Sequence, residues 1–117
     1  MIIKGKGINL ESTEIGDINL ESAETGFIDL RLAKIKNIYL ISAKTEDIYL
    51  YSAKTKDIDL ESAETKNINL NSAKTRNIYI KNLKTSDKEL NKLIQEFSKR
   101  DWKDCTLANF VEWIRER

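Results

Sequence analysis

Ile48-Tyr49-Leu50-Tyr51-Ser52-Ala53-Lys54-Thr55-Lys56-Asp57 is the clearest copy of a ten-residue unit that recurs eight times in this 117-residue chain. Isoleucine occupies the first position of every copy, from Ile8 to Ile78, and leucine or isoleucine follows two residues later. A fixed short period predicts that one structural unit is stacked on copies of itself. The repeat therefore decides the architecture.

The residue between Ala and Thr indicates which side chains face inward. It is Glu or Lys in every copy, so it is expected to lie in water. Neighbouring side chains of an extended chain point to opposite sides, which places the flanking Ala and Thr inside and, by the same alternation, Ile and Leu as well. Each unit then supplies four inward side chains, with one corner between Ser and Ala and another at the Asn or Asp.

Two units are predicted to form one coil of 20 residues, because a strand spans only about 3.3 Å per residue and ten residues cannot make two walls and two turns. At this spacing Glu24, Lys44, Glu64 and Lys84 alternate in sign, as favourable neighbours do, whereas Glu14, Lys34, Lys54 and Lys74 do not. We predict a mainly β protein, a parallel β-solenoid of about four coils rising about 4.8 Å each. An antiparallel meander is the alternative, and it would leave one apolar face uncovered.

Three polar columns are expected to serve the fold. Inward threonines need acceptors and are predicted to bond to one another or to corner carbonyls. The Ser and Asx columns lie where the chain must bend, and Asn and Asp tolerate left-handed conformations better than most residues. None of these roles requires a ligand.

The unit resembles two groups of repeat proteins. Split into fives, Ile-x-Leu-x-Ser and Ala-x-Thr-x-Asx are similar to pentapeptide repeats, which implies a four-sided right-handed coil of the same length, although Thr and Ile stand where that family prefers Leu or Phe and Ala. The run Gly16-Asp17-Ile18-Asn19-Leu20-Glu21-Ser22 resembles the Gly-Asp-Ile-x-Leu-x-Ser runs of adhesin-like and bactofilin-like β-solenoids. Both resemblances span residues 7–85 and imply a fold without functional residues to transfer.

The chain after Thr85 is predicted to be a helical cap, residues 86–117, on a solenoid of residues 1–85. Ser86 and Glu89 have the spacing of a capping box, and Asp104 or Thr106 would begin a second helix after a connection around residues 99–104. Such caps cover the open end of a solenoid. The predicted apolar faces are Leu90, Leu93, Ile94 and Phe97 on the first helix and Leu107, Phe110, Val111 and Ile114 on the second.

Composition argues against several classes of function. With 20 Lys plus Arg against 19 Asp plus Glu, the chain has no net field to attract nucleic acid or to imitate it. It contains no apolar run long enough for a membrane span and no signal-peptide pattern, and its single cysteine, Cys105, cannot form an internal disulfide. We therefore expect a cytoplasmic protein with no nucleic-acid or membrane partner.

Catalysis is also unexpected. The chain has no histidine, so Cys105 has no imidazole to activate it, and carboxylate pairs such as Asp57 and Asp59 lie on solvated walls. The corners lack the glycine-rich loops of calcium-binding solenoids. We expect no catalytic residues, no cofactor and no metal site.

Another protein is the expected partner, with the chain acting as an inhibitor, adaptor or assembly module. Exposed aromatic residues on a rigid strand make good anchors, although Tyr and Ile also simply favour strands, and the two tryptophans could fill the cap core. The candidate surface residues are Tyr39, Ile41, Tyr49, Tyr51, Tyr79, Trp102 and Trp113.

Self-assembly is the second hypothesis. Ile3, Ile8 and Leu10 are predicted to lie beneath an unpaired first strand, whose edge could join a second copy in a homodimer or filament, while Lys4 and Lys6 oppose such pairing. Ice binding by threonine ladders is a third hypothesis. The charged residue between Ala and Thr argues against it, because outward threonines would turn that charge into the core.

Overall fold

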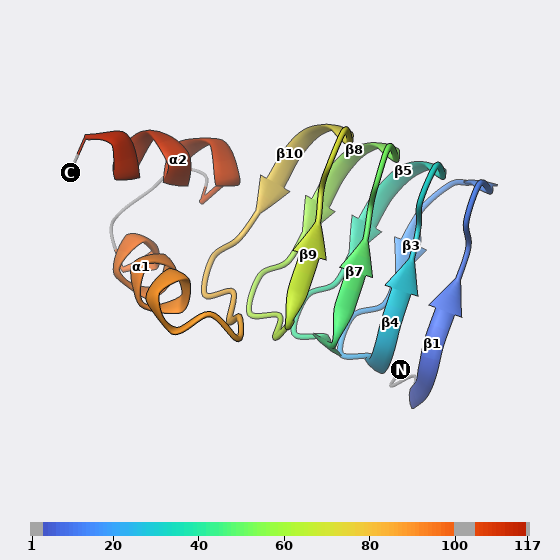
Figure 1. The fold of residues 1–117 in the computed structure, drawn as a ribbon, viewed down its shortest axis with the longest axis horizontal. Helices are drawn as coiled ribbons and strands as arrows, with labels where there is room; N and C mark the ends of the chain where they lie inside the picture. The colour runs from blue at the N-terminus through green and yellow to red at the C-terminus, as the bar shows by residue number, and fades with distance from the viewer. Residues whose placement is uncertain (1–3, 100–104, 117) are drawn as a thin grey trace.

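The protein is a parallel β-solenoid with a helical C-terminal end, as predicted (Figure 1). The computed structural model describes residues 4–99 and 105–116. Sheet A consists of β1 (Lys4–Asn9), β4 (Glu24–Asp29), β7 (Asp47–Tyr49) and β9 (Asn67–Asn69) in that order, with β6 (Lys44–Thr45) also paired to β4. Sheet B consists of β10 (Lys74–Tyr79), β8 (Lys54–Asp59), β5 (Lys34–Tyr39) and β2 (Glu14–Ile15), with β3 (Ile18–Asn19) also paired to β5.

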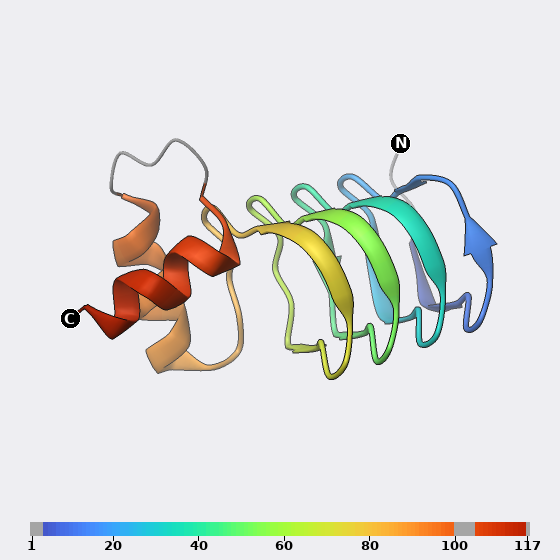
Figure 2. The same ribbon diagram turned by 90° about the horizontal axis from the view of Figure 1, so that it is seen from above.

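The register confirms a coil of 20 residues. Ile28 pairs with Ile48 in sheet A, and Ile38 pairs with Ile58 in sheet B. Successive units alternate between the two sheets, so two units make one coil, and seen from above the coils follow one another along the long axis (Figure 2). Stacking the columns in this way places the first-position isoleucine of one coil on that of the next.

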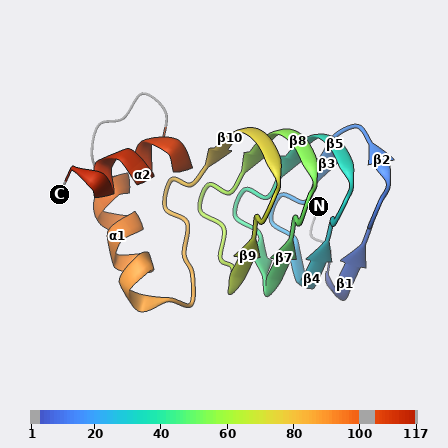
Figure 3. The same ribbon diagram turned by 45° about the horizontal axis from the view of Figure 1, so that its top comes forward.

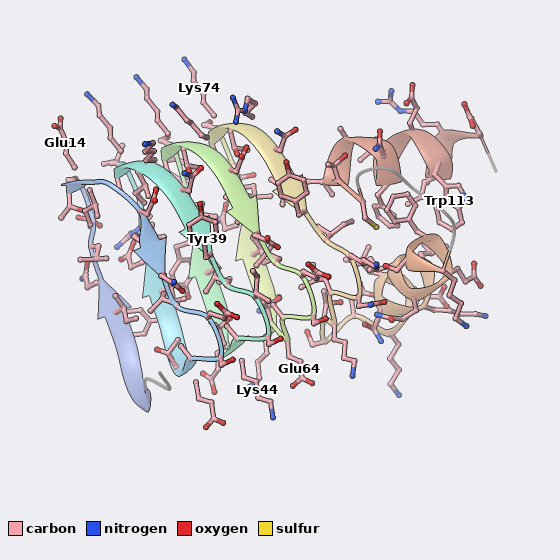
Figure 4. All side chains as sticks on the ribbon, turned by 180° about the vertical axis from the view of Figure 1, so that it is seen from behind. Glu14, Tyr39, Lys44, Glu64, Lys74 and Trp113 are labelled. Atoms are coloured by element: carbon pink, nitrogen blue, oxygen red, sulfur yellow. The ribbon has the colours of Figure 1, made fainter. Side chains whose placement is uncertain are left out.

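The inward and outward assignments are also confirmed. The Ile, Leu and Ala columns of the middle coils are fully buried, while the charged residues project outward, Glu14 and Lys74 on one side of the solenoid and Lys44 and Glu64 on another (Figure 4). Burial of these branched side chains stabilises the fold by about 25 cal/mol per Å² of apolar surface removed from water, and it is the main favourable contribution to the free energy of folding. The largest buried side chains of the solenoid are Ile28, Leu30, Ile38, Leu40, Ile48, Leu50 and Ile58.

The tight turn of each unit involves the serine column. Ala23 donates its N–H to the Leu20 carbonyl at 3.0 Å, and the serines adopt φ between 56° and 62°. The left-handed residues are therefore the serines rather than the Asx residues. The Asx side chains instead bond across coils, as Asn37 Nδ2 does to Asp17 Oδ1 at 3.0 Å, and several strands run without interruption through that position.

The threonine columns differ between the two sheets. In sheet B, Thr55 and Thr75 donate to the carbonyl oxygens of Lys36 and Lys56, as expected. In sheet A the hydroxyl oxygens of three buried threonines have no hydrogen-bond partner among the described residues, so the expectation is wrong for this column. These are Thr25, Thr45 and Thr65.

The two predicted helices are present as α1 (Lys88–Ser98) and α2 (Leu107–Arg115). Asp87, not Ser86, caps α1 by accepting the Leu90 N–H at 3.0 Å, because Ser86 still follows the solenoid and donates to the Lys66 carbonyl at 3.1 Å. Thr106 caps α2, while Asp104 lies outside the described residues.

The core of the cap differs in part from the predicted faces. Phe97 and Phe110 are buried and meet edge to face at 5.4 Å, and Trp113 packs on both rings. Val111 and Ile114, which were expected on this face, are exposed. The buried face of α2 therefore includes Trp113 and is rotated about the helix axis relative to the predicted face.

The cap supplies hydrogen bonds that another coil would otherwise make. Leu20, Leu40 and Leu60 donate their N–H to a carbonyl of the next coil, and Ile80, the last of this column, donates to the Cys105 carbonyl at 2.9 Å. Tyr79 and Thr106 then form an antiparallel bridge, which brings α2 against β10 (Figure 3). Polar side chains of α1 also bond to the backbone of the last turn, residues 83–85. Gln95 donates to the Leu83 carbonyl, and Asn91 accepts the Thr85 N–H.

Candidate interaction surface

The predicted surface residues separate onto the two sheets. Tyr39 and Tyr79 stand in one row of sheet B with Asp59 between them, and Ile41 lies in the turn after β5. Tyr49 lies on β7 in sheet A, and Tyr51 lies in the turn that follows it. All five are at least partly exposed, but they lie on two different sheets and therefore do not form one cluster.

The remaining predicted residues have different environments. Trp113 lies in the cap core against Phe97 and Phe110 rather than on the surface (Figure 4). Ile8 and Leu10 pack, only partly buried, at the first coil. Trp102 and Ile3 lie outside the described residues.

Apolar, aromatic and cationic side chains lie at least partly exposed on sheet A and its turns. We name this set the sheet A patch and define it as Phe27, Arg31, Leu32, Tyr49 and Tyr51. Phe27 is 40 % exposed, Leu32 56 % and Tyr51 47 %, which makes them the most exposed large apolar side chains of the described solenoid. Tyr49 pairs in register with Asp29, and the Leu32 N–H bonds to the Tyr51 carbonyl, so Arg31, Leu32, Tyr49 and Tyr51 lie on adjacent coils. The Phe27 ring lies farther along β4, over Gly7 of the preceding coil.

Arg31 is held in one position at the centre of this patch. Its Nε and Nη2 donate to the two carboxylate oxygens of Asp29 at 2.9 and 2.7 Å, and Nη2 also lies 2.8 Å from the Glu11 carboxylate. The hydrogen bonds from Arg31 lower the pKa of Asp29, and those to Asp29 raise the pKa of Arg31. Such a bidentate pair fixes the guanidinium plane while half of the side chain remains in solvent.

The ring of Tyr49 is oriented by its own strand. Its hydroxyl donates to Asp47 Oδ2 at 3.2 Å, and the negative charge of Asp47 raises the pKa of Tyr49. Phe27 is positioned by a glycine, since a Cβ at Gly7 would overlap its ring. The rings of Tyr49 and Phe27 are thus held in position by the solenoid itself.

Two members of the patch, Leu32 and Phe27, stand in columns of the repeat that are otherwise small or polar. Leu32 stands in the serine column at φ 62°, a left-handed conformation that costs a non-glycine residue about 1 kcal/mol or more. Phe27 replaces an Asx of the cross-coil ladder and is 40 % exposed. Tyr49 is only partly exposed and stands in a variable column, where it lacks the side-chain acceptor that Asp59 offers to the Glu61 N–H.

Sequence reasoning missed Phe27, Arg31 and Leu32. The signal was present for Phe27 and Leu32, which break columns that are otherwise polar or small, whereas Arg31 stands in a column that varies along the chain. A large apolar residue in an otherwise small or polar column is thus a better indicator of such a surface than aromatic content alone.

The described residues show little that suits catalysis. Across residues 4–99 and 105–116, no three carboxylate or thiol groups come together in a way that could hold a metal ion. Burial raises the pKa of the Cys105 thiol, which disfavours the nucleophilic thiolate. No helix in the described part of the chain is long and apolar enough to cross a membrane.

Comparison with known proteins yielded no relative: no protein-family model, no curated protein and no solved structure matches this chain.

Proposed function

We propose that this protein is a non-catalytic protein-binding module that engages its partner through the sheet A patch. The observation that carries the proposal is Leu32, a large apolar side chain that is 56 % exposed in a left-handed backbone position. Serine or asparagine fills the equivalent position in every other unit, and neither exposes a large apolar side chain to solvent. A residue that is unfavourable for folding and turned to solvent is explained by an interaction outside the chain.

The composition of the patch supports the same function. Aromatic residues and arginine are enriched among residues that dominate binding energy, and rings held on a rigid strand lose little entropy on contact. Arg31 offers a guanidinium already fixed by Asp29, and Tyr51 and Leu32 stand beside it. A partner surface with an apolar centre and a carboxylate or main-chain acceptor would complement this arrangement.

Affinity capture from an extract of the native host tests the proposal. The wild type, a Leu32→Ser/Tyr51→Ser variant and a Tyr39→Ser control on sheet B are compared by quantitative mass spectrometry. We expect one protein to be retained by the wild type and the control and to be lost at least tenfold with the patch variant. Equal retention by all three would contradict the proposal.

Self-association is supported as a second function by the first coil. β1 ends its sheet in the described structure, and Ile8 and Leu10 are only partly buried, whereas Ile28 and Leu30 are fully buried. Pairing of two such edges about a two-fold axis would bury these side chains and stop at a dimer. Light scattering should then give a dimer for the wild type and a monomer for Ile8→Lys, and a monomeric wild type at micromolar concentration would contradict this function.

A further inference from the structure

The last strand of sheet A, β9, has an unpaired edge next to the cap. Leu10, Leu30 and Leu50 each donate their N–H to a carbonyl oxygen of the next coil at 2.8 Å. Leu70 is the fourth residue of this column, but the position 20 residues later belongs to α1, and the Leu70 N–H has no acceptor among the described residues. The same holds for Ser72, although Ser52 donates to the Asn71 carbonyl at 2.9 Å.

The cap pairs with the last strand of sheet B but not with the last strand of sheet A. In sheet B, the Cys105 carbonyl accepts the N–H of Ile80 just after β10, and Thr106 forms an antiparallel bridge with Tyr79. In sheet A, the described part of the chain contains no segment that extends β9 on this side. Two backbone donors therefore point along the direction in which a further strand would lie.

An apolar cavity adjoins this edge. It has a volume of about 300 Å³, at the lower end of the range for ligand-binding pockets. Ile68 and Leu70 are partly exposed here, whereas their equivalents Ile48 and Leu50 are fully buried. The apolar walls between β9 and the cap are Ile68, Leu70, Leu90, Ile94, Leu107 and Phe110.

We propose that the β9 edge and this cavity bind an extended peptide segment of a partner protein, added to sheet A as a strand parallel to β9. A main chain supplies carbonyl acceptors at the spacing of the unpaired N–H groups of Leu70 and Ser72. The cavity accepts apolar side chains two residues apart, the spacing at which side chains of a strand share a face. The repeat itself defines the fitting sequence, an Ile-x-Leu pair stacked on Ile68 and Leu70.

Two other occupants fit less well. A small apolar molecule would fill the cavity but leave both donors without acceptors. The first coil of a second copy carries an Ile-x-Leu pair, Ile8 and Leu10, but it would bring its sheet B strands onto β10, where α2 already packs. A single strand would add to sheet A alone and leave the contact of α2 with β10 in place.

The probe is a fluorescein-labelled synthetic peptide with the sequence of the chain's own unit, Lys56–Ala63, which carries an Asp-Ile-x-Leu register. Fluorescence anisotropy measures its binding to the wild type and to Leu90→Lys, which places a charge at the cavity wall. Val111→Lys is the matched control, because Val111 is 40 % exposed and Leu90 38 %, and Val111 does not line the cavity. A second peptide, with Asn in place of the residues that correspond to Ile58 and Leu60, tests whether apolar side chains of the peptide are needed for binding, without altering the protein.

We expect saturable binding to the wild type and to Val111→Lys, and at least tenfold weaker binding to Leu90→Lys and of the Asn-substituted peptide. Amide hydrogen exchange at Leu70 and Ser72 should slow at least tenfold when the labelled peptide is bound. Absence of binding at millimolar peptide, or binding without protection of these two amides, would overturn the proposal. Binding of 1-N-phenylnaphthylamine that is sensitive to Leu90→Lys, without peptide binding, would overturn it in favour of a small-molecule site.

Discussion

Asn82 donates its backbone N–H to the hydroxyl oxygen of Ser98 at 2.9 Å. One coil earlier, Ser62 makes the equivalent bond to the backbone carbonyl of Lys81 at 2.9 Å. A side chain of α1 thus replaces a main-chain acceptor of the missing coil. The cap is therefore joined to the solenoid by the same hydrogen-bond pattern that joins one coil to the next, in addition to apolar packing.

Replacing Ser98 with Ala should destabilise the protein. The variant leaves the Asn82 N–H without its acceptor at a partly buried contact, at a cost of about 1 kcal/mol in the free energy of unfolding. Ser86→Ala is the control, because its hydroxyl bonds to the Lys66 carbonyl at an exposed position and should cost less than about 0.5 kcal/mol. Urea unfolding followed by circular dichroism compares them, and equal midpoints would show that the Ser98 bond contributes nothing.

Truncating Leu50 tests the stacked core. Leu50→Ala removes a fully buried side chain between two equivalent leucines and should cost about 2–5 kcal/mol. Lys54→Ala, four residues later and exposed, should stay within about 0.5 kcal/mol of the wild type. Thermal melts decide the matter: similar melting temperatures would mean that the inward and outward assignments are wrong.

Leu32→Asn should make the protein more stable. Asparagine occupies the same column at position 82 with φ 57°, and it accepts left-handed backbone more readily than leucine does. We expect a gain of about 0.5–1 kcal/mol, measured by denaturant unfolding. A loss of stability would mean that Leu32 serves the fold, and it would remove the main support for the proposed function.

Acid should weaken the Arg31 and Asp29 contact. Because this contact lowers the folded-state pKa of Asp29 below its ordinary value of 3.8, its contribution is complete well above pH 3.8 and is lost as the pH falls through the folded-state pKa. Asp29→Asn should therefore lose less melting temperature than the wild type between about pH 6 and about pH 3. Asp59→Asn, at the equivalent position of sheet B with Glu61 in place of an arginine, should follow the wild type; parallel curves for all three would contradict the assigned role of Arg31.

The architecture could be predicted because the same pattern of inward and outward residues recurs in every unit. Eight copies of one alternation identify the inward columns and the coil length, whatever any single residue prefers. The details that failed are those decided by single contacts. Asp87 rather than Ser86 caps α1 because Ser86 is still bonded to Lys66, and no pattern in the sequence shows that the solenoid continues for one more residue.

The candidate surface was harder to predict for a related reason. Tyr49 and Tyr51 were visible as aromatic residues, but Phe27 and Leu32 matter because of the backbone positions that they occupy. The positive φ of the serine column became known only from the structure. The open edge of β9 depends on how α1 and α2 sit on the last coil, which sequence periodicity does not encode.

The central claim is that sheet A, through its patch, is the binding face, and titration calorimetry with the captured partner tests it most directly. The wild type is compared with Tyr51→Ser in the patch and with Tyr79→Ser on sheet B. We predict that Tyr51→Ser weakens binding at least tenfold, equivalent to about 1.4 kcal/mol, and that Tyr79→Ser changes it less than twofold. The reverse order, with Tyr79→Ser weakening binding and Tyr51→Ser leaving it unchanged, would contradict the claim.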